Sequence, residues 1–220
     1  MRKLLLLRPE PGLSQSAERA ALLGLEVVTC PLFRIEPVQW AAPDPTAYDA
    51  LLLTSANAVR QAGPELKAVS GLPVHAVGAA TAEAARAAGL QVEAAGRSDI
   101  VALLADIPGS LKLLHLAGED RREVDSVHRI DRITVYRSAV IDNPDLPPLG
   151  GLVAAVHSPR AGARLAELSE AREGTAIAAI SPAAADACGP GWERVEAAAT
   201  PDDESLLAVA AMLCHTSPPR

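Results

Sequence analysis

Aromatic side chains are scarce in this chain of 220 residues, in which Phe, Trp and Tyr together make up 2%. A flavin-binding protein normally needs rings that can stack on the flavin, so this scarcity argues against that class. Apolar residues nevertheless make up 49% of the sequence. Alanine, leucine and valine must therefore fill the interior, as in proteins whose helices pack on parallel sheets.

The chain also lacks an excess of positive charge and any long apolar run. Its formal net charge is −7, whereas nucleic-acid-binding domains are normally basic. No apolar run approaches the roughly 18 residues that a membrane-spanning helix needs. The run that begins at Leu4 ends at Arg8, too early for a signal peptide. We therefore expect a cytoplasmic protein that binds neither nucleic acid nor a membrane.

Metal-binding and cofactor motifs are missing as well. Cys30, Cys188 and Cys214 are odd in number and far apart, so they form neither a metal-ligand spacing nor a disulfide framework. The sequence contains no GxGxxG after a strand, no P-loop and no cluster of histidines and cysteines. We predict buried, inert thiols, no metal and no organic cofactor.

Two stretches share a pattern in which a short apolar run meets polar residues and then an alanine-rich segment. Ala50–Leu53 is followed by Thr54 and Ser55, and Ala154–Val156 is followed shortly by Ser158. Uninterrupted apolar strands are typical of parallel sheets covered on both faces, and Ser or Thr is a good helix N-cap. Free N–H groups at such helix starts can bind an anion. The pattern predicts two similar α/β domains facing each other across a cleft.

The spacing of the apolar runs predicts a discontinuous first domain. Residues 1–35 and 148–220 together hold five strands, and residues 39–141 hold five more. The predicted strands are 4–7, 26–29, 50–53, 74–77, 92–94, 111–116, 130–136, 153–156, 176–180 and 195–198. Segments 33–38 and 141–151 carry proline and are predicted linkers around the inserted domain. The expected fold is α/β, with two parallel five-stranded sheets that each have helices on both faces.

Several segments, taken in order, resemble a known family. They are LLLLRPEPG, CPLFRIEPV, YDALLLTSANAV, VHAVGAATAEAARAAGL, ITVYRS, HSPRAG, IAAISPAAADA and TPDDESLLAV. Each alone is typical of ordinary strand–turn–helix packing, but their order and spacing over nearly the whole chain resemble uroporphyrinogen-III synthases. The resemblance implies two flavodoxin-like domains joined by a two-stranded linker, with no metal and no organic cofactor. The pair of linkers leads us to expect a monomer with mobile domains.

The resemblance also implies an activity, the cyclisation of hydroxymethylbilane in tetrapyrrole (heme) biosynthesis. The substrate is a linear tetrapyrrole rich in carboxylates, and loss of water from its hydroxymethyl group gives an electrophile. The far pyrrole attacks through its substituted carbon, and the spiro intermediate recloses with ring D inverted. Without enzyme the bilane closes to the unrearranged isomer, so the implied lyase must impose geometry more than supply reactive groups.

Matching the motifs residue by residue implies the site. Tyr136 matches the family's Val-Tyr pair and is the implied catalytic residue, because a phenol can donate a proton to a departing oxygen. Without the family match, Tyr136 would be an ordinary strand residue at the sheet rim. The implied substrate-binding residues are Arg8, Thr54, Ser55, Gly78, Thr81, Arg122, Ser158 and Ser181. The chain departs from the family where Ala183 and Ala184 replace threonines and where the connection after Leu116 is short.

Two other functions stay open at the level of sequence. One is a non-catalytic α/β protein or paralogue that binds a linear tetrapyrrole or another small anionic ligand. The other is a nucleotide- or flavin-binding protein, which the scarcity of rings disfavours. Trp40 and Trp192 do not fall in the strand-end loops of the inserted domain, where they could stack on a flavin.

Overall fold

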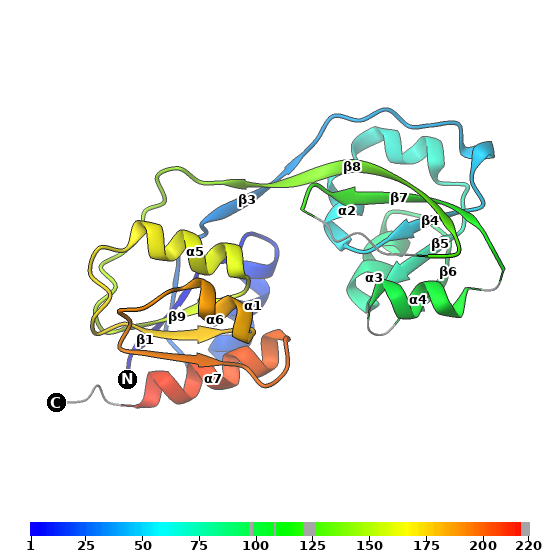
Figure 1. The fold of residues 1–220 in the computed structure, drawn as a ribbon. Helices are drawn as coiled ribbons and strands as arrows, with labels where there is room; N and C mark the ends of the chain where they lie inside the picture. Colours follow the sequence, from blue (N-terminus) through cyan, green and yellow to red (C-terminus); the bar gives the residue numbers. More distant parts are fainter. Residues whose placement is uncertain (97–98, 108, 121–125, 217–220) are drawn as a thin grey trace. The chain divides into compact units, whose positions relative to one another are not determined.

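The computed structural model describes residues 1–96, 99–107, 109–120 and 126–216. The chain divides into two compact units, and each is an α/β unit whose sheet consists mainly of parallel strand pairs. Unit 1 consists of Met1–Arg34 and Val140–Arg220, and unit 2 consists of Ile35–Ala139. In Figure 1 the blue and yellow-to-red ends of the chain form unit 1, and the cyan-to-green middle forms unit 2. None of the described helices is long and apolar enough to cross a membrane.

Unit 1 contains a five-stranded sheet in the order β2-β1-β9-β10-β11, as far as the described residues show. All four neighbouring pairs in that order are parallel. The strands are β1 (Lys3–Leu6), β2 (Val27–Thr29), β9 (Leu152–Val156), β10 (Ala176–Ala179) and β11 (Arg194–Ala197). The helices are α1 (Gly12–Leu22), α5 (Pro159–Leu168), α6 (Pro182–Ala187) and α7 (Asp203–His215).

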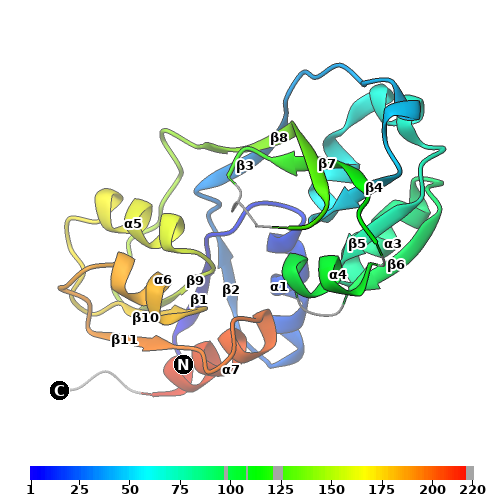
Figure 2. The same ribbon diagram turned by 45° about the vertical axis from the view of Figure 1, so that its right-hand side comes forward.

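The apolar run at the start of the chain is explained by helices on both faces of this sheet. Successive side chains of a strand point to opposite faces. Leu4 and Leu6 accordingly lie in a core with residues of α1 and α7, whereas Leu5 and Leu7 lie in a second core with residues of α5 and α6. Figure 2 shows the two helix pairs on either side of the sheet. A strand that is buried on both faces has no solvent-facing side, so its sequence does not alternate between apolar and polar residues.

Unit 2 contains a six-stranded sheet in the order β3-β8-β7-β4-β5-β6, again counting only the described residues. The strands are β3 (Phe33–Pro37), β4 (Ala50–Leu53), β5 (Val74–Val77), β6 (Val92–Gly96), β7 (Lys112–Gly118) and β8 (Arg129–Val140). The α-helices are α2 (Ala56–Gln61), α3 (Ala79–Ala87) and α4 (Ile100–Asp106), with 3₁₀ turns at Pro45–Ala47 and Gly63–Val69. Leu51 and Leu53 face the core that includes α2 and α3, and Ala50 and Leu52 face α4.

The prediction of a five-stranded sheet is wrong for unit 2. Most of the segment 33–38, which was predicted as a linker, forms β3, the sixth strand of this sheet. This strand is hydrogen-bonded to β8 at the sheet edge, and just beyond it the Val38 N–H donates to the Val135 carbonyl at 2.9 Å. The chain passes between the units at residues 34–35, within β3, and at residues 139–140, at the end of β8. Segment 141–151 belongs to unit 1, where Leu149 is buried.

The strand order identifies one distinctive position in the sheet of each unit. Counted along its own chain, unit 1 has the order 2-1-3-4-5, and the direction of succession reverses between β1 and β9. Unit 2, leaving β3 aside, has the order 3-2-1-4-5, and the reversal falls between β4 and β7. At such a switch point the connections leave to opposite faces, and ligands bind outside the carboxyl ends of the strands. These two strand ends are therefore where a functional site is expected.

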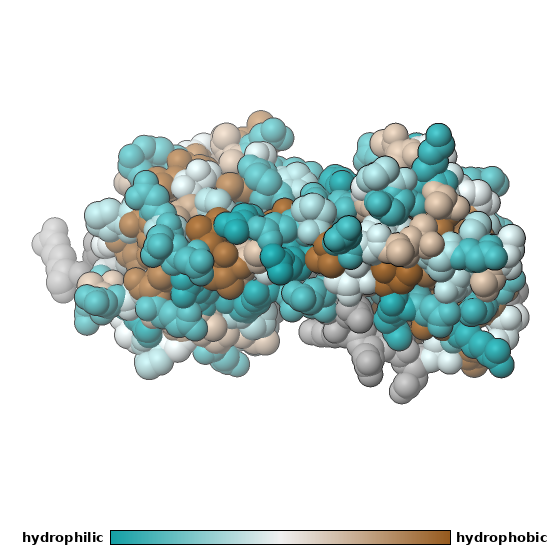
Figure 3. Space-filling view, turned by 90° about the horizontal axis from the view of Figure 1, so that it is seen from above, coloured by the Kyte–Doolittle hydropathy of each residue, from teal (hydrophilic) through white to brown (hydrophobic). Residues whose placement is uncertain are grey.

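The outer surfaces agree with the burial of apolar residues inside each unit. In Figure 3 hydrophilic or neutral residues cover most of the visible face of each unit, and hydrophobic ones form small separate groups. The fully buried large side chains include leucines of strands β1, β4 and β7. The polar groups considered as candidate functional groups are therefore those at the strand ends.

Candidate functional site

Two predicted binding serines of unit 1 begin helices. Ser158 follows β9, and its Oγ accepts the N–H of Ala161 at 3.1 Å, at the start of α5. Ser181 follows β10, and its Oγ accepts the N–H of Ala184 at 3.3 Å, at the start of α6. A hydroxyl that accepts one bond can still donate its proton to an anion. Both serines therefore combine an N-cap with a donor at the carboxyl end of the sheet.

Four polar side chains of unit 1 contact a single carboxylate, that of Asp203 at the start of α7. Its Oδ1 accepts hydrogen bonds from Arg8 Nη1 at 3.0 Å and from Ser16 Oγ at 2.7 Å. The same oxygen lies 2.9 Å from His157 Nε2, and Oδ2 accepts from Arg19 Nη1 at 2.7 Å. The side chains of Asp203 and His157 are only 12% and 8% exposed. We call these five residues the Asp203 cluster.

The protonation states of the Asp203 cluster follow from burial and pairing. Burial acts to raise the pKa of Asp203, but the hydrogen bonds from His157, Ser16 and Arg19 outweigh it and hold the pKa well below its usual range. Burial lowers the pKa of His157, and the bond to Asp203 offsets this only in part. The imidazole is thus neutral at neutral pH and donates its Nε2–H to the carboxylate. The ion pairs of Asp203 are those with Arg8 and Arg19.

Arg8, predicted to bind substrate, is engaged inside unit 1. Besides Asp203 its Nη1 contacts Ser16 Oγ at 2.9 Å, and 28% of the side chain is exposed. The guanidinium lies against the first turn of α1, where a Cβ on Gly12 would fall 2.4 Å from Nε. Burial lowers the pKa of Arg8, yet a guanidinium stays charged at neutral pH. Arg8 therefore ties the end of β1 to α1 and α7.

The sequence analysis missed Ser16, Arg19 and Asp203. Asp203 is more than 180 positions away from Ser16 and Arg19, so no local spacing could connect it to them. The available signal was the acidic start of α7, where Asp203 and Glu204 occupy the first turn. An acidic first turn is common for its favourable interaction with the helix dipole, and it does not by itself identify a cluster.

In unit 2 the polar residues after β4 have separate partners. Ser55 caps α2, and its Oγ accepts the N–H of Asn57 at 3.2 Å. Thr54 Oγ1 lies 3.0 Å from Nε2 of His115, on the neighbouring strand β7. Because β4 and β7 form the switch point, this hydroxyl–imidazole pair lies at the strand end where a ligand is expected.

Gly78 and Thr81 lie at the next strand end of unit 2. Gly78 follows β5 with a φ of 81°, a left-handed conformation that favours glycine, and leads directly into α3. Thr81 occupies the first turn of α3 and is 5% exposed. Gly78 thus makes the turn, and the threonine side chain is largely inside.

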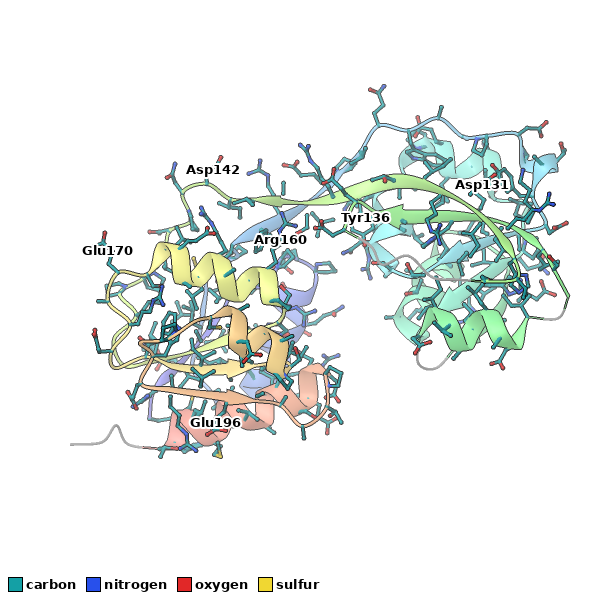
Figure 4. The ribbon with its side chains drawn as sticks, in the orientation of Figure 1. Asp131, Tyr136, Asp142, Arg160, Glu170 and Glu196 are labelled. Atoms are coloured by element: carbon teal, nitrogen blue, oxygen red, sulfur yellow. The ribbon has the colours of Figure 1, made fainter. Side chains whose placement is uncertain are left out.

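Tyr136 lies on β8 beside the carboxyl end of β7. It is in register with Gly118, the last residue of β7, and the Glu119 N–H donates to the Tyr136 carbonyl at 3.0 Å. The phenol lies over Gly118, since a Cβ built there would be 2.8 Å from the phenol oxygen. The ring is partly buried against the main core of the unit, and Figure 4 shows it where β8 passes the end of β7. The phenol oxygen is therefore at the switch-point end of the sheet.

The structure groups the predicted residues by unit. Unit 1 brings Arg8 and Ser158 to the ends of the adjacent strands β1 and β9, with Ser181 after the next strand. In unit 2, Thr54 follows β4, and Tyr136 of β8 lies beside the end of β7, the strand between β4 and β8. Arg122 lies outside the described residues.

Possible metal ligands and thiols are two further kinds of group to consider beside the strand ends. In the described ranges, no group of three or more His, Cys, Asp and Glu side chains could hold a metal ion. Cys30, Cys188 and Cys214 are free and buried. Burial raises the pKa of the Cys188 and Cys214 thiols to about 11, so they are not nucleophilic thiolates at neutral pH.

Comparison with protein families decides the affiliation of the chain. The family model described as uroporphyrinogen-III synthase HemD matches residues 14–208, which is most of the sequence. The chain belongs to the uroporphyrinogen-III synthase family. The resemblance inferred from the ordered motifs is thereby confirmed, together with the enzyme class, a cyclising lyase of heme biosynthesis.

Solved structures of uroporphyrinogen-III synthases are similar to this chain. The enzyme of Helicobacter pylori 26695 is 17% identical, the match covers 97% of this chain and 100% of that one, and the TM-score is 0.66. The Thermus thermophilus enzyme is 18% identical over 97% of this chain and 100% of that one, with a TM-score of 0.43. The Helicobacter pylori match supports the α/β fold alone. No curated protein matched the chain.

Proposed function

We propose that this chain converts hydroxymethylbilane into uroporphyrinogen III, losing water and inverting ring D through a spiro intermediate. The observation that carries the proposal is the family match over residues 14–208. The position of Tyr136 beside the carboxyl end of β7 supports a role for it as the proton donor. The protein would act as a cytoplasmic monomer, with the bilane as its partner and without cofactor, metal, nucleic acid or membrane.

Tyr136 is the proposed catalytic residue. Hydroxide leaves poorly from the hydroxymethyl group, so a proton must reach the departing oxygen as the carbon–oxygen bond breaks. The partly buried ring packs against the core, while the hydroxyl lies over Gly118 at the end of β7. General acid assistance of this kind typically contributes about 10²–10⁴-fold to a rate.

The substrate carboxylates are proposed to meet hydroxyl and N–H donors at the strand ends. Ser55, Ser158 and Ser181 suit this role best, since each begins a helix and keeps a hydroxyl proton to donate. The other proposed substrate-binding residues are Arg8, Thr54, Gly78, Thr81 and Arg122. Arg8 would act through its charge while it stays bonded to Asp203, and Gly78 through the turn that opens α3.

The chain is further proposed to consist of two domains joined by a two-stranded linker. We assign residues 1–35 and 148–220 to a discontinuous domain and residues 39–141 to an insertion, joined through 33–38 and 141–151. The flavodoxin-like description suits unit 1, whose strand order 2-1-3-4-5 is that of flavodoxins. For unit 2 the order 3-2-1-4-5 agrees better with the classic dinucleotide-binding sheet.

The first test is the reaction itself. Purified protein given freshly made hydroxymethylbilane is expected to yield mainly the type III isomer, because binding imposes the geometry that free bilane lacks. The oxidised products are separated by chromatography, with and without prior treatment of the protein with a chelator. Type I product alone, at the spontaneous rate, would instead identify a non-catalytic protein that binds a linear tetrapyrrole or another small anion.

A pair of variants at Ser158 separates helix capping from substrate binding. Ser158→Asp retains a good N-cap and favours the helix dipole, so the melting temperature should stay near that of the wild type. The added negative charge should repel substrate carboxylates and raise KM several-fold. Ser158→Ala should show the converse, a loss of about 1 kcal/mol in the free energy of unfolding with a smaller change in KM. An unchanged KM in Ser158→Asp would exclude this helix start from carboxylate binding.

A further inference from the structure

Gly118 makes an unusually close approach to the proposed catalytic side chain. A Cβ at this position would lie 2.7 Å from Cζ and 2.8 Å from the phenol oxygen of Tyr136. Ordinary contacts between such atoms are about 3.5–4.0 Å. The backbone of Gly118 does not have a positive φ, so its conformation would suit any residue. Glycine is needed here because the Tyr136 ring occupies the space that a side chain at this position would fill.

The pairing of β7 and β8 changes register at the same point. Ala117 is in register with Thr134, and the next residue, Gly118, is in register with Tyr136. One residue of β8, Val135, is thus extra, and its side chain is fully buried. Such a bulge turns the side chain that follows it and is common beside functional sites. The bulge therefore directs Tyr136 over the end of β7, and Gly118 provides the room for it.

We propose that Gly118 is a positioning residue, which through its missing side chain sets where the Tyr136 hydroxyl lies at the strand end. This rests on the proposed function, in which that hydroxyl donates the proton. An alanine methyl group would displace the far end of the ring by about 1 Å. The atoms in conflict belong to the end of a side chain rather than to backbone, so the protein can accommodate the methyl group by moving the phenol.

The test is Gly118→Ala, with a readout on the ring as well as on catalysis. The sequence has two tyrosines, Tyr48 and Tyr136, so protein labelled with ¹³C at the tyrosine Cζ should give two NMR signals. Tyr136→Phe assigns them. Gly118→Ala is expected to move the Tyr136 signal, leave the Tyr48 signal in place, and lower kcat roughly 10- to 100-fold. Gly71→Ala is the matched control, since a Cβ there meets no atom within 4 Å.

A double-mutant cycle decides whether Gly118 acts through Tyr136. If it does, Gly118→Ala should cost little additional kcat in protein that already carries Tyr136→Phe. An equal loss in both backgrounds, or an unmoved Tyr136 signal, would overturn the proposal. A moved signal with unchanged kcat would support the positioning and reject the proton-donor role of Tyr136.

A second variant covers the case in which Gly118→Ala does not fold. The clash is with the ring, so Gly118→Ala combined with Tyr136→Ala should recover the melting temperature of Tyr136→Ala alone. A double variant that melts well below Tyr136→Ala would show that Gly118 is required for another reason, and the proposal would fall.

Discussion

Replacing Tyr136 with phenylalanine is expected to slow turnover by well over tenfold while the fold and the substrate affinity are retained. The change removes one oxygen at the end of β7 and leaves the ring packed against the core of unit 2. A lost general acid typically costs about 10²–10⁴-fold. Some activity should remain, because positioning alone contributes roughly 7–11 kcal/mol in favourable cases. The measurements are kcat and KM for bilane consumption and the melting temperature.

Tyr48→Phe is the control for that prediction. The Tyr48 hydroxyl donates to Asp131 Oδ2 at 3.1 Å, so its loss removes a hydrogen bond of about 0.5–1.5 kcal/mol at most. We expect turnover near that of the wild type. Should Tyr136→Phe also retain wild-type turnover at an unchanged melting temperature, Tyr136 would be structural. The proton would then come from a carboxylic acid of the substrate or from water.

The largest stability effect is expected at Asp203. Asp203→Asn keeps the shape of the side chain but leaves Arg8 without its charged partner in a mostly buried place. Removing one member of a buried ion pair typically costs 3–5 kcal/mol, and the partial exposure of Arg8 places the expected loss near the lower end, about 3 kcal/mol. Urea unfolding at neutral pH measures it. Glu204→Gln, at an exposed position in the same helix turn, should change the free energy of unfolding far less.

The pH dependence of that loss follows from the same contacts. The pKa of Asp203 is lower in the folded protein than the value of about 3.9 in an unfolded chain. Its contribution is therefore complete above that pH and is lost progressively as the pH falls below it. The stability difference between wild type and Asp203→Asn should accordingly shrink below about pH 4. A difference that stays constant down to pH 3 would show that the carboxylate charge is not what stabilises unit 1.

His157 adds a second acid-sensitive step with the same sign. Burial lowers its pKa, so the unfolded chain takes up this proton before the folded protein does. Stability should therefore begin to fall as the pH drops below about 6.5, the ordinary pKa of histidine. The decline should also occur in Asp203→Asn and extend to lower pH there, because the carboxylate that partly offsets the effect of burial on the pKa of His157 is gone.

Local pattern was sufficient for the central strands. The ranges 50–53 and 74–77 were predicted to the residue, because these mainly apolar segments meet polar or turn residues at both ends. Local pattern was not sufficient to identify β3, because its alternating sequence with Pro37 fits a linker as well as an edge strand. Only hydrogen bonding to β8 distinguishes the two, and that pairing joins residues about one hundred positions apart.

The sequence by itself determined the family, the order of the strands other than β3, and the strand-end location of most candidate residues, since all of these depend on neighbours along the chain. The tertiary structure alone decided which of these residues share partners. It placed Arg8 in contact with Asp203, which is 195 positions away in the sequence. Arg8, a predicted substrate-binding residue, is thus part of the Asp203 cluster. It also placed the phenol of Tyr136 over Gly118, because strand register and a bulge determine which side chain meets which backbone.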